Sequence, residues 1–132
     1  MAGMAGETEK ITINVGPVDL GQIDLLVQEG FYSNRTDFIR SAIRNQLISH
    51  AGALQQTIAR KTLVLGLQHY TREHLESVRA SGQRLRVQVL GLARIADDVS
   101  PELAMATIES INVLGAFHAS AAVKRALADR IG

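Results

Sequence analysis

The feature that most constrains this chain is a single alternating segment near its N-terminus that has no second strand to pair with. Residues 10–15, Lys-Ile-Thr-Ile-Asn-Val, alternate polar and apolar side chains, which is typical of a half-buried amphipathic strand. Gly16-Pro17 ends the segment, and the following residues have helical spacing, so no hairpin is expected. A lone strand leaves backbone groups unpaired on both edges, and a strand from a second chain removes that cost. The segment therefore predicts a homodimer.

Two helices are expected after the strand. Asp19 followed by Gln22 resembles a capping box and predicts a first helix of about ten residues, which Gly30 ends. Ser33 or Asn34 is expected to cap a second helix that carries an apolar face as far as Leu47. A strand-helix-helix unit of about forty residues buries too little apolar surface to fold alone. Two copies could share one core.

The order of these elements and three stretches of sequence resemble the ribbon-helix-helix family, which includes Arc-like, MetJ-like and CopG-like repressors. The stretches are Lys-Ile-Thr-Ile-Asn-Val at 10–15, Gly-Phe-Tyr-Ser-Asn-Arg-Thr-Asp-Phe-Ile-Arg at 30–40, and Ser-Ala-Ile-Arg at 41–44 with Leu47. The resemblance covers about residues 8–49. It implies an intertwined homodimer that inserts a two-stranded antiparallel ribbon, one strand from each subunit, into the major groove of double-stranded DNA.

The resemblance also implies which residues would contact DNA. The outward side chains of the strand, Lys10, Thr12 and Asn14, would read base edges. The N-terminus of the second helix would anchor a phosphate through the backbone amides near Ser33, Asn34 and Arg35. The sequence leaves open whether Arg40 and Arg44 contact DNA or form a solvated helix face.

Charge is distributed unevenly along the chain, whose net charge is only +1. Residues 1–50 contain four basic and six acidic residues, a balance of −2, and residues 51–132 contain ten basic and seven acidic residues, a balance of +3. The DNA-binding half is therefore expected to act through a few focused groups and not through a strongly basic surface.

The second half of the chain contains a weak internal repeat. Val-Leu-Gly occurs at residues 64–66, 89–91 and 113–115, at spacings of 25 and 24 residues. Each copy predicts a short strand, a polar turn and a helix, with the helices at residues 72–80, 101–108 and 121–131. Such units would stack as a small solenoid-like parallel sheet in which the glycine permits close backbone approach, although chance self-similarity would give the same pattern. No family is recognised for this half.

The expected fold class is α+β, with four segments along the chain. Residues 1–7 are expected to be a disordered tail, residues 8–50 the ribbon-helix-helix domain and residues 51–61 a linking helix. Residues 62–132 are expected to form the strand-helix repeat domain, which serves oligomerisation to a tetramer or higher, or partner binding, because its exposed ends invite stacking.

Several function classes are not indicated. There is no cysteine, and His69 and His74, at i,i+5, have weak spacing for metal ligands, so no metal or other cofactor is expected. No catalytic motif is found, and an enzyme is not expected. No stretch is apolar enough for a membrane span and no signal peptide is found, so a cytoplasmic protein is expected.

The leading hypothesis is a transcriptional repressor or autoregulator. An accessory DNA-binding protein of plasmid transfer or partition would carry the same ribbon, and the sequence does not separate the two. An antitoxin whose second half binds a toxin is a further alternative, although antitoxin tails are commonly short and disordered before binding.

Overall fold

The computed structural model describes residues 8–132, so the tail expected at residues 1–7 lies outside the described residues. The chain divides into two compact units, one ending at Gln56 and the other running from Thr57 to Gly132. None of the helices in residues 8–132 is long and apolar enough to cross a membrane.

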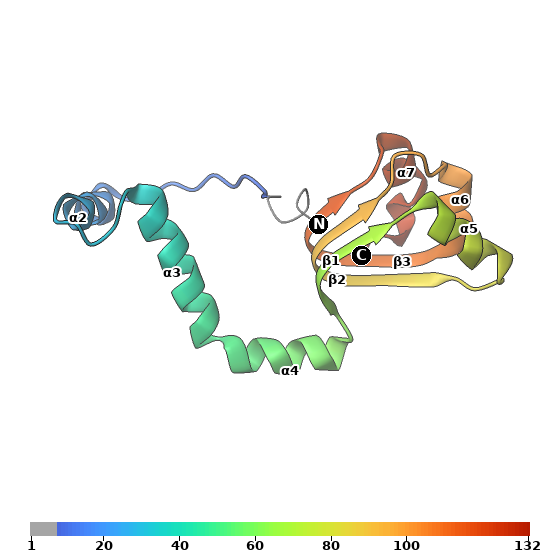
Figure 1. The fold of residues 1–132 in the computed structure, drawn as a ribbon, viewed down its shortest axis with the longest axis horizontal. Helices are drawn as coiled ribbons and strands as arrows, with labels where there is room; N and C mark the ends of the chain where they lie inside the picture. Colours follow the sequence, from blue (N-terminus) through green and yellow to red (C-terminus); the bar gives the residue numbers. More distant parts are fainter. Residues whose placement is uncertain (1–7) are drawn as a thin grey trace. The chain divides into compact units, whose positions relative to one another are not determined.

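The first unit contains an extended segment followed by helices (Figure 1). Residues 8–16 are assigned to neither helix nor strand in the single chain. Helix α2 spans Pro17–Gln28 and α3 spans Arg35–Ser49, and the boundary between the two units falls within α4, Ala51–Lys61. The two predicted helices follow in the expected order, whereas the strand predicted at residues 10–15 is not formed in the single chain.

Helix α2 begins earlier than predicted, and the expected capping box is wrong. Its first residue is Pro17 and its N-cap is Gly16, which has no side chain to accept a hydrogen bond from a helix amide. Proline suits the first helical position because its missing N–H has no partner there in any case. The predicted stop is confirmed: Gly30 has φ +84°, and the amides of Gly30 and Phe31 donate to the carbonyls of Val27 and Leu26.

The first unit has no interior as a single chain. Among the described residues 8–62, no side chain is buried. Ile11 is 76% and Ile13 64% exposed in the extended segment. An apolar cavity of about 270 Å³, lined in part by Ile23, Leu26 and Phe38, lies between α2 and α3. Residues that were predicted to face a core therefore lack the surface that would cover them.

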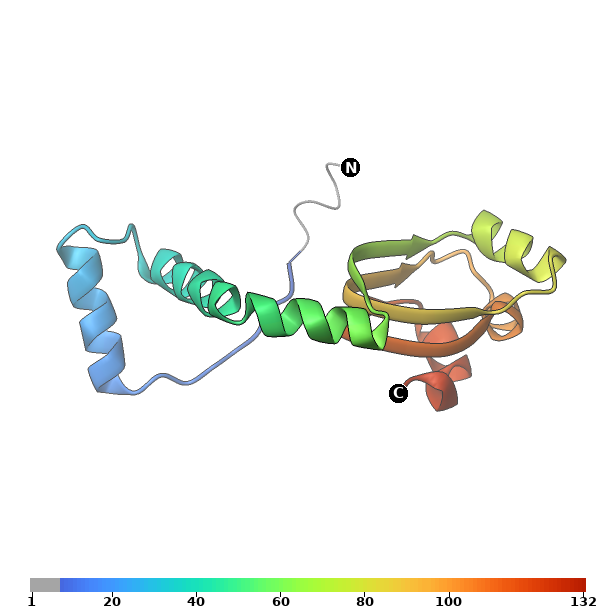
Figure 2. The ribbon, with the colours of Figure 1, turned by 90° about the horizontal axis from the view of Figure 1, so that it is seen from below.

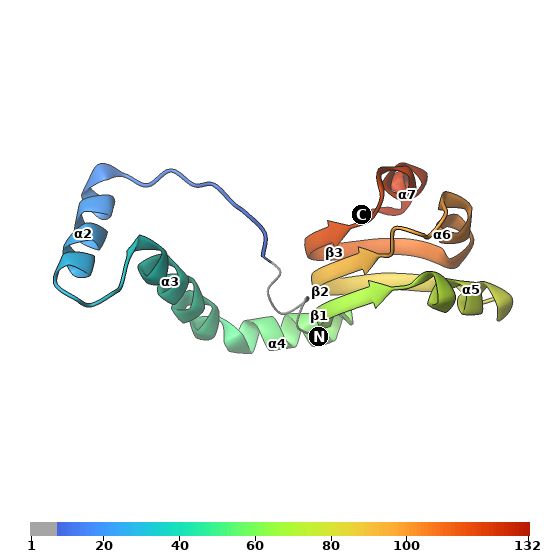
Figure 3. The ribbon, with the colours of Figure 1, turned by 45° about the horizontal axis from the view of Figure 1, so that its top comes forward.

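The second unit is built from three strand-helix pairs. Strand β1 (Val64–Tyr70) precedes α5 (Arg72–Ala80), β2 (Leu85–Ile95) precedes α6 (Pro101–Thr107), and β3 (Ile108–His118) precedes α7 (Ala121–Ala126) and the short 3-10 helix η1 (Ala128–Arg130). The strands form one parallel sheet in the order β1-β2-β3, which Figure 3 shows side by side. The protein is thus α+β, and α5 has the predicted bounds.

The sequence repeat coincides with the register of this sheet. Gly66 pairs with Gly91, and Gly91 pairs with Gly115. All three glycines have positive φ, and a Cβ on Gly91 or Gly115 would lie 2.1 Å from the carbonyl oxygen of the preceding glycine in the row. The close backbone approach that was predicted for these positions is confirmed. Strands β2 and β3 also double back on themselves (Figure 2), and a mid-strand glycine permits such a bend.

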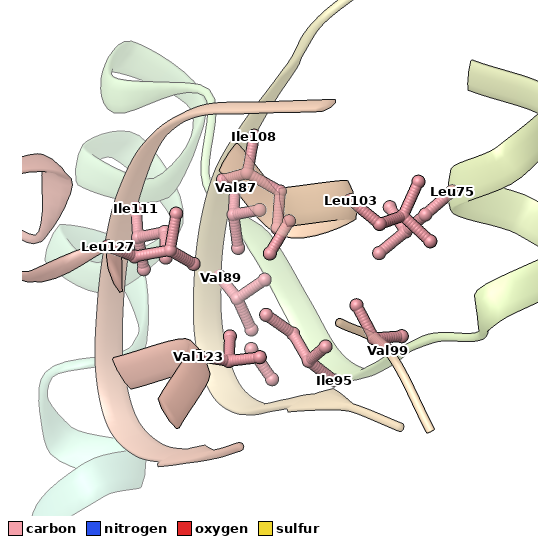
Figure 4. Close-up of a cluster of buried hydrophobic side chains, with 12 residues drawn as sticks. Leu75, Val87, Val89, Ile95, Val99, Leu103, Ile108, Ile111, Val123 and Leu127 are labelled. Carbon is pink, nitrogen blue, oxygen red and sulfur yellow. The ribbon is translucent and has the colours of Figure 1, made fainter. Parts of the chain in front are cut away.

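The core of the second unit lies on the concave side of the curved sheet. Val87, Val89, Ala93 and Ile95 of β2 alternate along the strand and are all buried. They belong to one cluster with side chains from the three helices, Leu75, Leu103 and Val123 (Figure 4). The helices therefore cover one face of the sheet only.

The opposite face of the sheet is convex and apolar on both sides of the glycine row. We call it the convex leucine surface, and its members are Leu65, Leu67, Leu90, Leu92, Leu114 and Ala116. Leu65 is 69% exposed and Leu114 49% exposed. No described element of the second unit buries these side chains.

Candidate nucleic-acid interface

The side chains predicted to read bases lie on the extended segment of residues 8–16. Lys10, Thr12 and Asn14 are all exposed, and they alternate with the apolar side chains Ile11 and Ile13. The segment keeps the period of a strand, in which successive side chains point to opposite faces. As a strand, the segment would therefore have one polar and one apolar face, but residues 8–16 are assigned to neither helix nor strand in the single chain.

The predicted phosphate anchor lies at the N-terminus of α3, where two reciprocal hydrogen bonds fix the backbone. The side-chain Oδ1 of Asn34 accepts from the amide of Asp37 at 2.8 Å, and the Asp37 carboxylate accepts from the amide of Ser33 at 2.9 Å. Asn34, not Ser33, is therefore the cap. The amides of Arg35 and Thr36, in the first turn, have no partner within the helix because of helix geometry.

A cavity of about 360 Å³ opens at this helix end. Its lining includes Ser33, Asn34 and Asp37 together with three residues spaced by four along α3, Thr36, Arg40 and Arg44. Residues four apart share a helix face, so both arginines lie on the side of α3 that carries the cap. The structure thus brings Arg40 and Arg44 to the predicted anchor. Their spacing from Thr36 was the signal in the sequence.

Arg35 is engaged elsewhere through its side chain. Its guanidinium donates to both carboxylate oxygens of Asp24 in α2, at 2.7 and 2.8 Å. This two-point hydrogen bond, with the added charge of Arg35, lowers the pKa of Asp24. The Arg35 side chain therefore ties α2 to α3, and only its backbone amide is oriented toward the helix end.

The histidines considered as metal ligands do not form such a site. The rings of His74 and Tyr70 stack edge to face with centroids 6.4 Å apart, whereas His69 pairs in register with Arg94 of β2. Within residues 8–132, no group of three or more histidine, aspartate or glutamate side chains could hold a metal ion.

Comparison with known proteins identifies the family. Residues 6–124 match the ribbon-helix-helix transcriptional regulator family, whose proteins bind DNA, usually dimerise and are typically not enzymes. The match extends beyond residues 8–49, which carry the resemblance in the sequence, and includes all three strands of the sheet. Searches of curated proteins and of solved structures give no significant match. Because the match spans most of the sequence, the chain belongs to the ribbon-helix-helix transcriptional regulator family.

Proposed function

We propose that this protein is a sequence-specific repressor or autoregulator that reads the major groove with a ribbon formed by two subunits. The observation that carries the proposal is the missing interior of residues 8–62. No side chain there is buried, although Ile11, Ile13 and Val15 lie on one face of an extended segment. Pairing two such segments antiparallel would satisfy their backbone groups and turn both apolar faces toward a shared core.

The polar face of the ribbon would then supply the base contacts. Lys10 can donate to guanine O6 or N7, and the amide of Asn14 can pair with the donor and acceptor of adenine. The methyl and hydroxyl groups of Thr12 suit a thymine methyl or a polar base edge. All three side chains are exposed in the single chain, so no described part of the chain covers them.

The N-terminus of α3 would anchor a phosphate beside the ribbon. The Asn34 cap and the hydrogen bond from the Ser33 amide to Asp37 fix the first turn. Helix geometry leaves the amides of Arg35 and Thr36 without a partner within the helix, so they can bind an anion. Arg40 and Arg44 line the same cavity and add two positive charges, which offset the carboxylate of Asp37. This arrangement supports strong local attraction in a half of the chain whose net charge is negative.

The second unit, residues 57–132, is called the sheet unit below. It would join dimers through the convex leucine surface, with a second copy of this chain as the partner. Its six apolar positions form rows on either side of the glycines and repeat from strand to strand, as in a solenoid-like stack. Such a surface can pack on its own copy about a twofold axis. Because family members usually dimerise, a second copy is already held at high effective concentration.

The order in the sheet unit favours a repressor over an antitoxin. Antitoxin tails that mask a toxin commonly fold only on binding, whereas residues 57–132 have a buried core of their own. An accessory protein of plasmid transfer would share the ribbon, and its DNA target would be a transfer origin instead of a promoter.

The ribbon is tested by replacing Ile13 with proline. Ile13→Pro removes a ladder donor and an apolar side chain, so we expect loss of the ribbon dimer, of the unfolding transition of the first unit and of DNA binding. The second unit has its own core and should keep its unfolding transition. Ile13→Val is the matched control, since it keeps the donor and a β-branched side chain, and we expect it to resemble the parent. Sedimentation, thermal unfolding and DNA gel shifts measure the three properties. An Ile13→Pro monomer that folds and binds DNA normally would overturn the ribbon.

A further inference from the structure

A third cavity lies at the carboxyl ends of the parallel strands, outside the parts proposed to bind DNA. Its volume is about 520 Å³, within the range of small-molecule sites. In open parallel sheets ligands bind at the carboxyl ends of the strands, because the loops that follow the strands diverge there and leave a crevice. The cavity therefore stands at a position of the fold suited to a ligand.

Three nitrogen-bearing side chains stand in one row across this edge. His69, Arg94 and His118 are in-register partners on β1, β2 and β3, so neighbours in the row are one strand spacing apart. All three line the cavity. Neighbouring strands lie about 4.8 Å apart, which allows a single small group to reach more than one of these side chains.

The hydrogen bond within the row defines which atoms can donate. One guanidinium nitrogen of Arg94 lies 3.2 Å from Nδ1 of His118. A guanidinium has no acceptor, so Arg94 donates this hydrogen bond and His118 Nδ1 accepts it, which leaves Nε2 as the donor position of the ring. Arg94 and His118 therefore carry N–H donors at adjacent positions.

Charge in the cavity is predominantly positive. Lys124 of α7 lines it, with its ammonium 5.8 Å from the centroid of the Phe117 ring, and Arg94 adds a second permanent cation. Asp97 supplies the one carboxylate of the lining. Two fixed cations disfavour a metal ion, and an arginine fork matches the oxygens of a carboxylate or phosphate.

We infer that this cavity binds a small anionic molecule through a carboxylate or phosphate group held by Arg94, Lys124 and the two histidines. The rest of the lining, Ile95, Ala96 and Ala119, is apolar and would contact the uncharged part of the molecule. The site lies in the sheet unit, so the protein would carry a ligand site separate from the DNA-reading segment. This inference goes beyond the proposed function and does not depend on it.

The test is an NMR titration of the full chain with inorganic phosphate and, separately, with acetate, at ionic strength kept constant with sodium chloride. We expect saturable shifts confined to the amides of residues 69–70, 94–97 and 118–120 and to the Arg94 side chain. A larger response to phosphate than to acetate assigns a phosphate group, and the reverse assigns a carboxylate. Absence of saturable shifts with either anion would overturn the inference.

Three exposed single-charge variants make the test specific. Lys124→Gln removes a lining cation and should weaken binding about tenfold, the effect of removing one charge-assisted hydrogen bond. Arg125→Gln, the next residue on the same helix and not part of the lining, should leave affinity unchanged. Asp97→Asn should strengthen binding several-fold. Equal weakening by Lys124→Gln and Arg125→Gln would instead mean diffuse attraction to the surface and would overturn the site.

Titration without DNA separates this inference from the proposed function. Loss of DNA binding in Ile13→Pro says nothing about the cavity, and unchanged phosphate binding in a chain that fails to bind DNA still supports the site.

Discussion

The four basic side chains of residues 1–50 differ in what they contact. Lys10 lies on the polar face of the extended segment, and Arg40 and Arg44 line the cavity at the N-terminus of α3. Arg35 instead holds Asp24 through both of its carboxylate oxygens. In the proposed function, three of these cations would contact DNA in two distinct roles, whereas the fourth stabilises the contact between two helices.

The two roles predict two kinds of binding defect. Lys10→Ala or Asn14→Ala should cost about 1–3 kcal/mol at the cognate site and reduce discrimination between sequences, because the shortened side chain no longer reaches a base edge. Arg40→Gln or Arg44→Gln should weaken binding to all sequences alike and reduce the salt slope by about 0.9 for each phosphate that is no longer neutralised. Fluorescence anisotropy on cognate and random duplexes over a range of salt concentrations measures both.

Arg35→Gln is the matched control for these arginine variants, since it removes the same charge from the same helix. Its guanidinium is already bonded to Asp24, so the change in salt slope should be smaller than for Arg40→Gln.

Equal loss of affinity at cognate and random sites in Asn14→Ala would show that Asn14 does not read base edges.

The Asp24–Arg35 pair predicts a specific pH dependence of stability. The pKa of Asp24 is lowered from its ordinary value of 3.8, mainly by the hydrogen bond from Arg35. Because the pKa is lower in the folded state, the pair stabilises the protein fully at a pH above the unfolded-state pKa. This contribution is lost as the pH falls through the folded-state pKa. Asp24→Asn should therefore lower Tm slightly near neutral pH, because the pair is exposed, and the difference from the parent should vanish in acid.

Thermal unfolding of both chains across the acid range checks this sign. A difference that grows toward low pH would contradict the assignment of the lowered pKa to this pair.

At the scale of elements, the glycine row determines how closely the strands of the sheet pack. A Cβ on Gly91 would stand 2.1 Å from the carbonyl oxygen of Gly66, and a Cβ on Gly66 would meet nothing within 4 Å. Both residues have φ well inside the region that side chains rarely adopt, +139° and +121°. Both positions therefore require a positive φ, and they differ only in whether an added Cβ would clash with the neighbouring strand.

This contrast predicts graded destabilisation. Gly66→Ala should cost about 1–3 kcal/mol for its backbone conformation alone. Gly91→Ala should cost clearly more, because backbone atoms of the neighbouring strand must move, and Gly115→Ala should resemble Gly91→Ala. Urea unfolding of the three variants gives the free energies. Equal costs at Gly66 and Gly91 would mean that strand separation does not depend on the glycine row.

Local signals in the sequence predicted most elements of the fold. The helix predicted to begin at residue 101 does begin there as α6, and the hydroxyl of Ser100 accepts from the amide of Leu103 as a cap should. The recurrence of Val-Leu-Gly predicted which strand residues stand side by side. The start of α2 was missed because Gly16-Pro17 suits both a strand end and a helix start, and only the backbone conformation decides between them.

The cavity at the strand ends was missed although its signal was present. His69, Arg94 and His118 are separated by the same 25 and 24 residues as the Val-Leu-Gly copies, so the repeat itself places them in one row. Proximity along the chain instead favoured pairing His69 with His74. Sheet curvature and the cavity volume depend on packing between distant segments, which no local pattern encodes.

At the scale of the whole molecule, the two units differ in how they complete their folds. The sheet unit has a buried cluster within one chain, whereas residues 8–62 have no buried side chain. Dimerisation through the ribbon would supply the missing core of the first unit. It would leave the convex leucine surface of each sheet unit still to be covered.

A role of the convex leucine surface in assembly would show in the oligomeric state of the chain. If this surface joins dimers, the full chain should be a tetramer or higher, and Leu65→Lys or Leu114→Lys should reduce it to a dimer that binds a single half-site normally and loses cooperative occupation of adjacent sites. Met105→Lys is the matched control, because Met105 is 43% exposed on α6 and lies outside the convex leucine surface. Light scattering and footprinting on one and two half-sites measure both effects. If the parent chain is already dimeric on and off DNA, or if Met105→Lys dissociates it as readily as Leu65→Lys, this surface does not join dimers.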